Sequence, residues 1–234
     1  MGMVAAPSPL LVCELGTIEY SAASQLQARL RDLRQRDAID DVLLMLEHPP
    51  VYTRGRRSQP GELPMGEDWY RTQGIDVVAT HRGGRLTYHG PGQLVGYPIV
   101  RMTDVVAYLR RLEQAIVAAL EGEGIDAGPR EGLTGVWVDD RKIASIGVHV
   151  SRGVTTHGFA VNVDNDLQPF SWVVPCGLEG VQMTSVARET GRRTPDLLPR
   201  FTQAAAAAVA DALGRQARSI APEELDAAVV GLVA

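Results

Sequence analysis

Apolar residues in this chain gather in short runs that are bounded by proline, glycine or charge. Five such runs predict β-strands: LLVCELG, VLLMLEH, IDVVATH, LVGYPIV and THGFAVNV. A longer stretch, GVWVDDRKIASIGVHV, predicts a β-hairpin with its turn at Asp139, Asp140 and Arg141. The middle of the chain is therefore rich in strands.

Helical spacing of apolar residues appears between and after these runs. Residues 21–37 carry Leu26, Leu30 and Leu33 on one face. Thr103 and Asp104 can cap a second helix that ends at two glycines, with an apolar face made of Val105, Leu109, Leu112, Ile116 and Leu120. A third helix is predicted from residue 197 to 213, and Pro222 starts a short fourth one.

This order of elements predicts an α+β fold, in which helices flank a mixed β-sheet. The chain has 234 residues, of which 45% are hydrophobic, enough for a full core. No linker-like stretch interrupts it, so we expect a single domain over residues 1–234.

Net charge and cysteine content narrow the possible partners. A net charge of −5 argues against nucleic-acid binding, and no apolar run is long enough to span a membrane. Two cysteines and a start that makes a poor signal peptide favour reduced thiols in a cytoplasm. Arg54, Arg56 and Arg57 form one basic cluster, either a solvated loop or a docking patch for an acidic or phosphate-bearing partner.

The two cysteines differ in their surroundings. Cys13 lies within an apolar strand, where a buried and inert thiol is expected. Cys176 lies between Pro175 and Gly177, where the chain can turn sharply and present a side chain to a cleft. From these residues alone, Cys176 is either a reactive or a structural cysteine.

A reactive thiol needs a neighbour that favours the thiolate, because its free pKa is about 8.5. Candidates are His89, His149, His157 and Lys142. Lys142 is the only lysine in a chain that otherwise uses arginine, which cannot give up its proton in a protein. Lys142 is therefore either a proton-transferring residue or a surface lysine at a hairpin turn.

The segment THRGGRLTYHGPGQLVGYPIV combines four glycines with Arg82, Tyr88, His89 and Gln93. It matches neither a Walker loop nor a dinucleotide-binding motif, and it is either a pair of tight turns or a binding loop. Metal-ligand spacing of the HxH, HExxH or CxxC kind is missing from the sequence, as is the GxSxG motif of serine hydrolases.

Four motifs in order resemble the lipoyl(octanoyl) transferase family of lipoate biosynthesis: HPPVYTRGR, RGGRLTYHGPGQLVGYPI, RKIASIG and THGFAVNVDNDLQPFSWVVPCGL. The resemblance covers roughly residues 10–190. Arg85 stands where relatives often carry another polar residue, and Trp172 is bulky for its place.

The resemblance implies a biotin/lipoate protein ligase-like fold and an acyltransferase without a cofactor or metal. The donor would be octanoyl-acyl carrier protein, and the acceptor a lysine on lipoyl domains of 2-oxoacid dehydrogenases or on the glycine cleavage H protein. Cys176 would carry the acyl group as a thioester, and Lys142 would lower its pKa and shuttle protons, with His157 as possible support. The implied substrate pocket comprises Arg82, Gly83, Gly84, Arg85, Leu86, Thr87, Tyr88, His89, Ser145, Ile146, Gly147, Gly158, Phe159 and Ala160.

Three alternatives stand beside this interpretation. A cysteine hydrolase would use Cys176 with His157 and Asn162. An ATP-dependent lipoate-protein ligase would leave the cysteine idle. An acyl-binding or regulatory module would not depend on Cys176 for any reaction.

Overall fold

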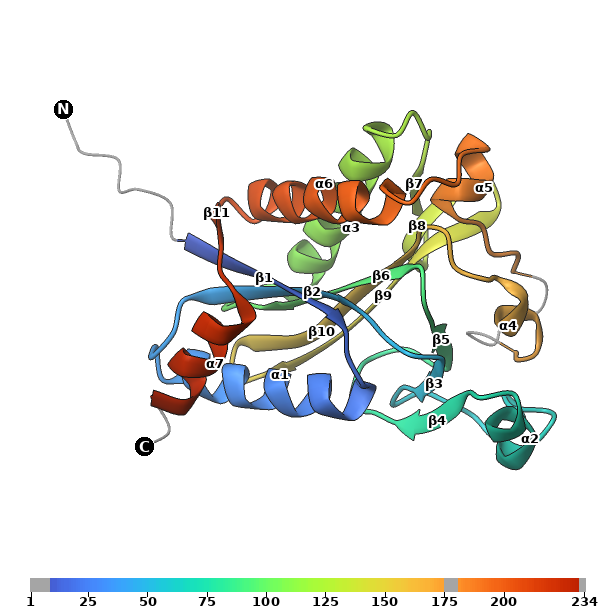
Figure 1. The fold of residues 1–234 in the computed structure, drawn as a ribbon, viewed down its shortest axis with the longest axis horizontal. Coiled ribbons are helices and arrows are strands. Elements are labelled where there is room, and N and C mark those ends of the chain that lie inside the picture. Colours follow the sequence, from blue (N-terminus) through green and yellow to red (C-terminus); the bar gives the residue numbers. More distant parts are fainter. Residues whose placement is uncertain (1–8, 175–180, 232–234) are drawn as a thin grey trace.

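The computed structural model describes residues 9–174 and 181–231. Its main feature is a mixed eight-stranded sheet with the strand order β11-β1-β2-β6-β10-β9-β8-β7 (Figure 1). The strands are β1 (Pro9–Thr17), β2 (Asp41–Glu47), β6 (Gln93–Ile99), β7 (Gly128–Arg130), β8 (Leu133–Val138), β9 (Arg141–Ser151), β10 (Val154–Asn162) and β11 (Gln216–Ser219). Among the described strands of this sheet, β1 pairs in parallel with β2 and with β11, and the remaining pairs are antiparallel.

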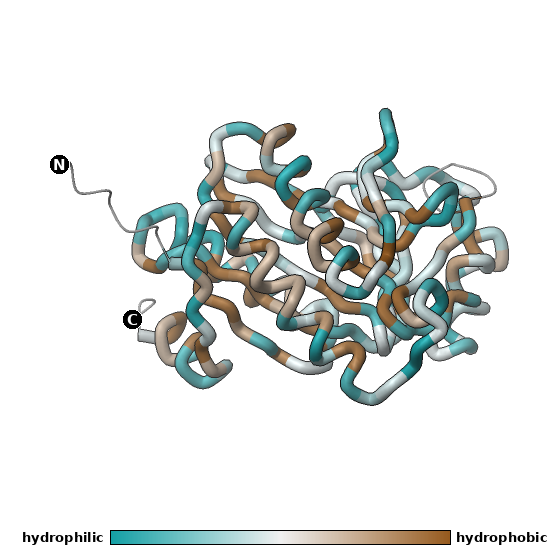
Figure 2. Tube along the Cα trace, turned by 90° about the horizontal axis from the view of Figure 1, so that it is seen from above, coloured by the Kyte–Doolittle hydropathy of each residue, from teal (hydrophilic) through white to brown (hydrophobic). Residues whose placement is uncertain are grey.

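Helices cover both faces of this sheet. The helices α3 (Val105–Glu121) and α6 (Leu197–Ala212) lie on one face, and α1 (Tyr20–Gln35) and α7 (Pro222–Gly231) on the other (Figure 1). Alternate residues of β2 enter the two cores, with Leu43 and Met45 on the α3 side and Val42 and Leu44 on the α1 side. In Figure 2, which looks down on the layers from above, hydrophobic stretches cross the middle of the molecule and many of the outer loops are hydrophilic.

A second sheet of three strands lies at one end of the main sheet (Figure 1). Its strands are β3 (Val51–Arg54), β4 (Asp76–Ala79) and β5 (Thr87–His89), and the short helices nearby are α2 (Glu67–Thr72) and α4 (Gln168–Ser171). Aromatic side chains, among them Tyr52, Tyr70, Tyr88 and Phe170, form a separate small core beneath it. The remaining short helix is α5 (Val186–Thr190).

The sequence predicted the fold class and its main elements correctly, including the hairpin of β8 and β9. Asp104 caps α3 as expected, since its carboxylate accepts hydrogen bonds from the backbone N–H groups of Val106 and Ala107. The prediction that Val105 belongs to the apolar face was wrong, because Val105 is 40% exposed. It lies at the helix start, and burial begins a turn later with Tyr108 and Leu112.

The helices of residues 9–174 and 181–231 include no candidate membrane span, because none combines the required length with sufficient hydrophobicity.

Candidate active site

A pocket lies where the small sheet meets β9 and β10 of the main sheet. Its walls come from the start of α1, the segment that leads into β5, β5 itself, and strands β6, β9 and β10. The lining residues are Tyr20, Arg82, Gly84, Arg85, Leu86, Thr87, His89, Tyr97, Lys142, Ser145, Ile146, Gly147, His157, Gly158, Phe159 and Ala160.

Three sequence motifs that are far apart along the chain therefore meet at this pocket. All of the predicted pocket residues line it except Gly83 and Tyr88. Successive side chains of a strand point to opposite sides, so Thr87 and His89 reach the pocket while Tyr88 points away. Tyr88 instead packs against Tyr52 and Phe170 in the small core.

Two glycines of the glycine-rich segment serve the packing of the protein on itself. A Cβ atom on Gly90 would lie 2.2 Å from the Tyr88 hydroxyl oxygen, and one on Gly92 would lie 2.4 Å from a carboxylate oxygen of Asp164. Packing within the protein therefore accounts for these two glycines. Gly84, by contrast, lines the pocket.

Lys142 is a buried residue and not a surface lysine of the hairpin turn. It stands second in β9, is 8% exposed and lines the pocket. Its ammonium group lies 5.4 Å from the centre of the Trp137 ring, within range of a cation–π interaction.

The neighbouring strand makes room for the Lys142 side chain at Gly135. A Cβ on Gly135 would lie 2.7 Å from Lys142 Cε, and its φ of +129° also favours glycine. The buried carboxylate of Glu113 on α3 fixes this position by accepting a hydrogen bond from the Gly135 N–H. Sequence reasoning missed Gly135, although a glycine within a strand pattern is a signal for such close approach.

The backbone of Lys142 is tied to the segment from Gln182 to Thr184. The Lys142 N–H donates to the Gln182 carbonyl at 2.8 Å, and the Thr184 N–H donates to the Lys142 carbonyl at 2.9 Å. Cys176, the predicted nucleophile, lies outside the described residues, as does Gly177. The chain that follows Cys176 is thus anchored to the strand that carries Lys142.

A chain of hydrogen bonds fixes the tautomer of His89. The Asn162 amide donates to the Thr184 carbonyl, which leaves the Asn162 side-chain oxygen to accept from the Gln93 amide. The Gln93 oxygen must then accept, so His89 Nδ1 carries the proton that it donates at 2.7 Å. Burial, followed by the charge of His48, lowers the His89 pKa well below its usual value. His89 is therefore neutral, and its Nε2 is a hydrogen-bond acceptor.

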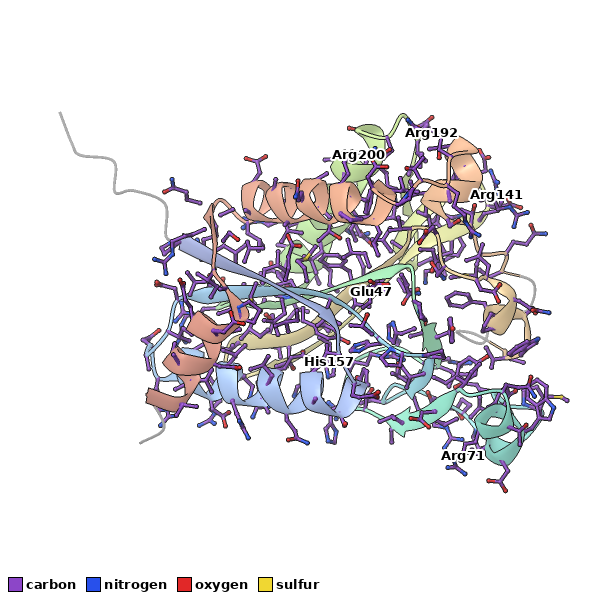
Figure 3. The ribbon with its side chains drawn as sticks, in the orientation of Figure 1. Glu47, Arg71, Arg141, His157, Arg192 and Arg200 are labelled. Atoms are coloured by element: carbon purple, nitrogen blue, oxygen red, sulfur yellow. The ribbon has the colours of Figure 1, made fainter. Side chains whose placement is uncertain are left out.

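His157 lies between the sheet and α1 (Figure 3). Its backbone N–H donates to the side chain of Gln27, and its ring nitrogen Nδ1 lies 3.5 Å from the Tyr20 hydroxyl. Burial and the nearby Arg82 guanidinium lower the His157 pKa to about 3. The described partners of Asn162 include Gln93 and Thr184 but not His157, so these two predicted hydrolase residues do not form a pair.

The buried histidines predict a loss of stability in acid. His48, His89 and His157 all have lowered pKa values, so the unfolded chain binds protons below about pH 6.5 while the folded protein resists them. For His157 alone this costs about 2 kcal/mol of unfolding free energy between pH 7 and pH 5. Urea unfolding at both pH values should therefore show a smaller pH difference in unfolding free energy for His157→Asn than for the wild type. Asparagine is chosen because it tolerates the φ of +58° at this position.

The exposed Arg218 on β11, at the edge of the main sheet, provides the control. Arg218→Gln should leave the pH difference as in the wild type. An unchanged difference in His157→Asn would mean that this ring does not contribute to acid unfolding.

The fold defines a class of proteins with lipoate and biotin protein ligases as structural neighbours. The chain belongs to the family described as the lipoyl protein ligase A/B catalytic domain, whose model matches residues 19–210. An octanoyltransferase of Mycobacterium sp. (strain KMS) is 48% identical over 221 residues, which cover 90% of this chain and 89% of the relative. The resemblance to octanoyltransferases predicted from the motifs is confirmed.

Solved structures agree on the fold. A crystal structure of lipoate-protein ligase A bound with ATP has a TM-score of 0.71 at 18% identity, covering 97% of this chain and 94% of that one. A biotin protein ligase of Aquifex aeolicus has a TM-score of 0.51 at 13% identity, covering 87% and 70%. The predicted biotin/lipoate protein ligase-like fold is therefore confirmed.

Proposed function

We propose that the protein moves an octanoyl group from octanoyl-acyl carrier protein to a lysine of a lipoyl domain, through a thioester on Cys176. The observation that carries this proposal is that the only lysine, Lys142, is buried in the pocket. Its strand, β9, is hydrogen-bonded to Gln182 and Thr184, in the chain that follows Cys176. The octanoyltransferase relatives support the acyl group and the reaction class.

The first half-reaction exchanges one thioester for another. The Cys176 thiolate attacks the octanoyl carbonyl carbon, a new C–S bond forms, and the carrier thiolate leaves and takes a proton from the Lys142 ammonium. Because the two thioesters have similar energy, this step needs no ATP. The neutral Lys142 amine that remains is ready for the second half-reaction.

The second half-reaction forms an amide. The amine of the acceptor lysine attacks the thioester, gives a proton to Lys142, and releases the Cys176 thiolate. His89 Nε2 can only accept a hydrogen bond, so it suits an N–H of the incoming amine. Amides are more stable than thioesters, which makes the overall transfer favourable.

The pocket also suits an apolar chain. Leu86, Ile146 and Phe159 line it, whereas Tyr88, which the resemblance also placed in the pocket, does not. Burial of about seven carbons of an octanoyl chain at about 0.8 kcal/mol each would stabilise the complex by roughly 5 kcal/mol.

An assay of products tests the proposed function. The enzyme is incubated with octanoyl-loaded carrier protein, with and without a lipoyl domain, and without ATP. We expect octanoyl-lysine on the lipoyl domain and little free octanoate. Free octanoate as the main product under both conditions would support a hydrolase, and a requirement for ATP would support a ligase.

A basic surface next to the pocket supports docking of an acidic carrier. Arg56 and Arg57 are exposed, and their backbone N–H groups donate to the carbonyls of Arg82 and Gly84 at 3.0 Å. Arg54, by contrast, forms an ion pair with Glu67 at 2.7 Å. The two exposed arginines therefore lie directly beside Arg82 and Gly84, which line the pocket.

Charge reversal of this surface should weaken use of the carrier. We expect Arg56→Glu with Arg57→Glu to raise the KM for octanoyl-carrier protein by roughly 10-fold, about 1.4 kcal/mol, and more at low salt. Transfer from a small neutral octanoyl thioester should stay unchanged. Arg218→Glu, on the exposed β11 at the sheet edge, is the control. An unchanged KM for the carrier in the double variant would remove the docking role.

A further inference from the structure

We propose that an arginine-lined cavity at the other end of the main sheet binds a small organic anion that bears a phosphate or carboxylate group. The cavity has a volume of about 350 Å³. It is lined by Arg34, Asp41, Val100, Arg101, Met102, Thr103, Asp104, Ala107, Tyr108, Arg111, Leu213 and Arg215. None of these residues belongs to the pocket around Lys142.

The cavity and the candidate active site are separated by the length of the central strands. Asp41 begins β2, and Glu47, at the far end of that strand, accepts a hydrogen bond from Gly92 in the glycine-rich segment. Seven residues of a β-strand span about 20 Å. In Figure 1 the start of β2 lies at the left end of the sheet, opposite β3 and β5. The cavity is thus a separate place in the fold.

A buried carboxylate anchors two of the arginines from one side. Asp41 is 3% exposed and accepts from Arg34 Nε at 2.7 Å, from Arg215 Nε at 3.0 Å and from the backbone N–H of Arg101 at 3.1 Å. Both guanidinium groups therefore contact this carboxylate through Nε, and their terminal nitrogens are left for other partners. Such an anchor holds a guanidinium in a fixed orientation.

Some guanidinium donors of the cavity are not paired with the nearby carboxylates. Asp37 forms ion pairs with Arg34 Nη1 and Arg101 Nη2, and Asp104 caps α3. Within residues 9–174 and 181–231, the Arg215 terminal nitrogens and the whole Arg111 guanidinium make no hydrogen bond or ion pair. The lining holds four arginines and two aspartates, and Asp37 beside it adds a third carboxylate, so a net positive charge remains.

A purely structural role accounts for only part of this arrangement. Arg34 and Arg215 link α1 and β11 to β2 through Asp41, and this explains their presence. It does not include Arg111, an exposed residue of α3 that borders the same cavity and forms no ion pair with either aspartate among the described residues. Planar guanidinium groups bind phosphate and carboxylate oxygens in a bidentate manner. The side chains of Val100, Met102, Tyr108 and Leu213 add an apolar wall for the organic part of the ligand.

Calorimetric titration of the whole protein with phenyl phosphate and with benzoate, at an ionic strength held constant with NaCl, tests this proposal. We expect saturable binding of at least one probe. Arg111→Gln and Arg215→Lys should each raise its Kd at least five-fold, because lysine keeps the charge of Arg215 but loses the planar fork. Tighter binding of phenyl phosphate would identify a phosphate ester as the ligand class, and tighter binding of benzoate a carboxylate.

Two controls keep the result specific. Arg188 is an exposed residue of α5, and Arg56 lies next to the candidate active site. The variants Arg188→Gln and Arg56→Gln should each bind the probe with the Kd of the wild type. Octanoyl transfer by Arg111→Gln should be unchanged, so this proposal and the proposed function can fail separately. Absence of saturable binding in the wild type, or equal weakening by Arg188→Gln, would overturn the proposal.

Discussion

Mass spectrometry of the enzyme mixed with octanoyl-loaded carrier alone should show one added octanoyl group on the wild type, and none on Cys176→Ser. Hydroxylamine should remove the group, as expected of a thioester. Transfer to a lipoyl domain should fall by at least about 10³-fold in this variant, because serine has no thiolate to act as the nucleophile at neutral pH. The experiment tests the covalent route directly.

The second cysteine of the chain provides a matched control. Cys13 is fully buried in β1, and burial, followed by the charge of Asp226, raises its thiol pKa to about 11. Cys13→Ser should therefore form the adduct and transfer the acyl group as the wild type does. An adduct that persists in Cys176→Ser and disappears in Cys13→Ser would reverse the assignment of the nucleophile.

Lys142→Arg should lower octanoyl transfer by about 10²- to 10⁴-fold, the usual contribution of a general acid–base residue. Arginine keeps the positive charge, but it cannot release a proton to the leaving thiolate or take one from the attacking amine. The measurement is single-turnover transfer from carrier to lipoyl domain, together with the rate of adduct formation.

Two further observations separate chemistry from packing in this experiment. The space near Gly135 is tight, so the larger guanidinium could disturb the strand pair, and the thermal midpoint of unfolding must be compared with that of the wild type. Lys142→Met is close to lysine in length and carries no proton to exchange, so it should be as inactive as Lys142→Arg. Near-normal turnover in Lys142→Arg, with Lys142→Met inactive, would mean that the charge alone is enough.

Local patterns were sufficient for the elements that bury a continuous apolar face. The runs around Cys13, Leu44 and Val161 were assigned as strands from their composition, and each lies in the main sheet. The sequence predicts no strand at β3, β5 or β11, because these short elements lack the continuous apolar run that marks the equally short β4. Their places depend on partners distant in the chain, as when Val51 pairs with both Asp76 and His89.

By itself, the sequence determined the family, the mixed-sheet fold class and the candidate chemistry of one lysine and one cysteine, because ordered motifs and residue types are local properties. The side on which each residue of a motif lies was decided only by tertiary structure. Strand alternation brings His89 to the pocket and turns Tyr88 away, and pairing of β8 with β9 buries Lys142 beside Gly135. The arginine-lined cavity likewise exists only in the folded protein, because Arg34, Arg111 and Arg215 come together only when α1, α3 and the chain leading into β11 pack around the start of β2.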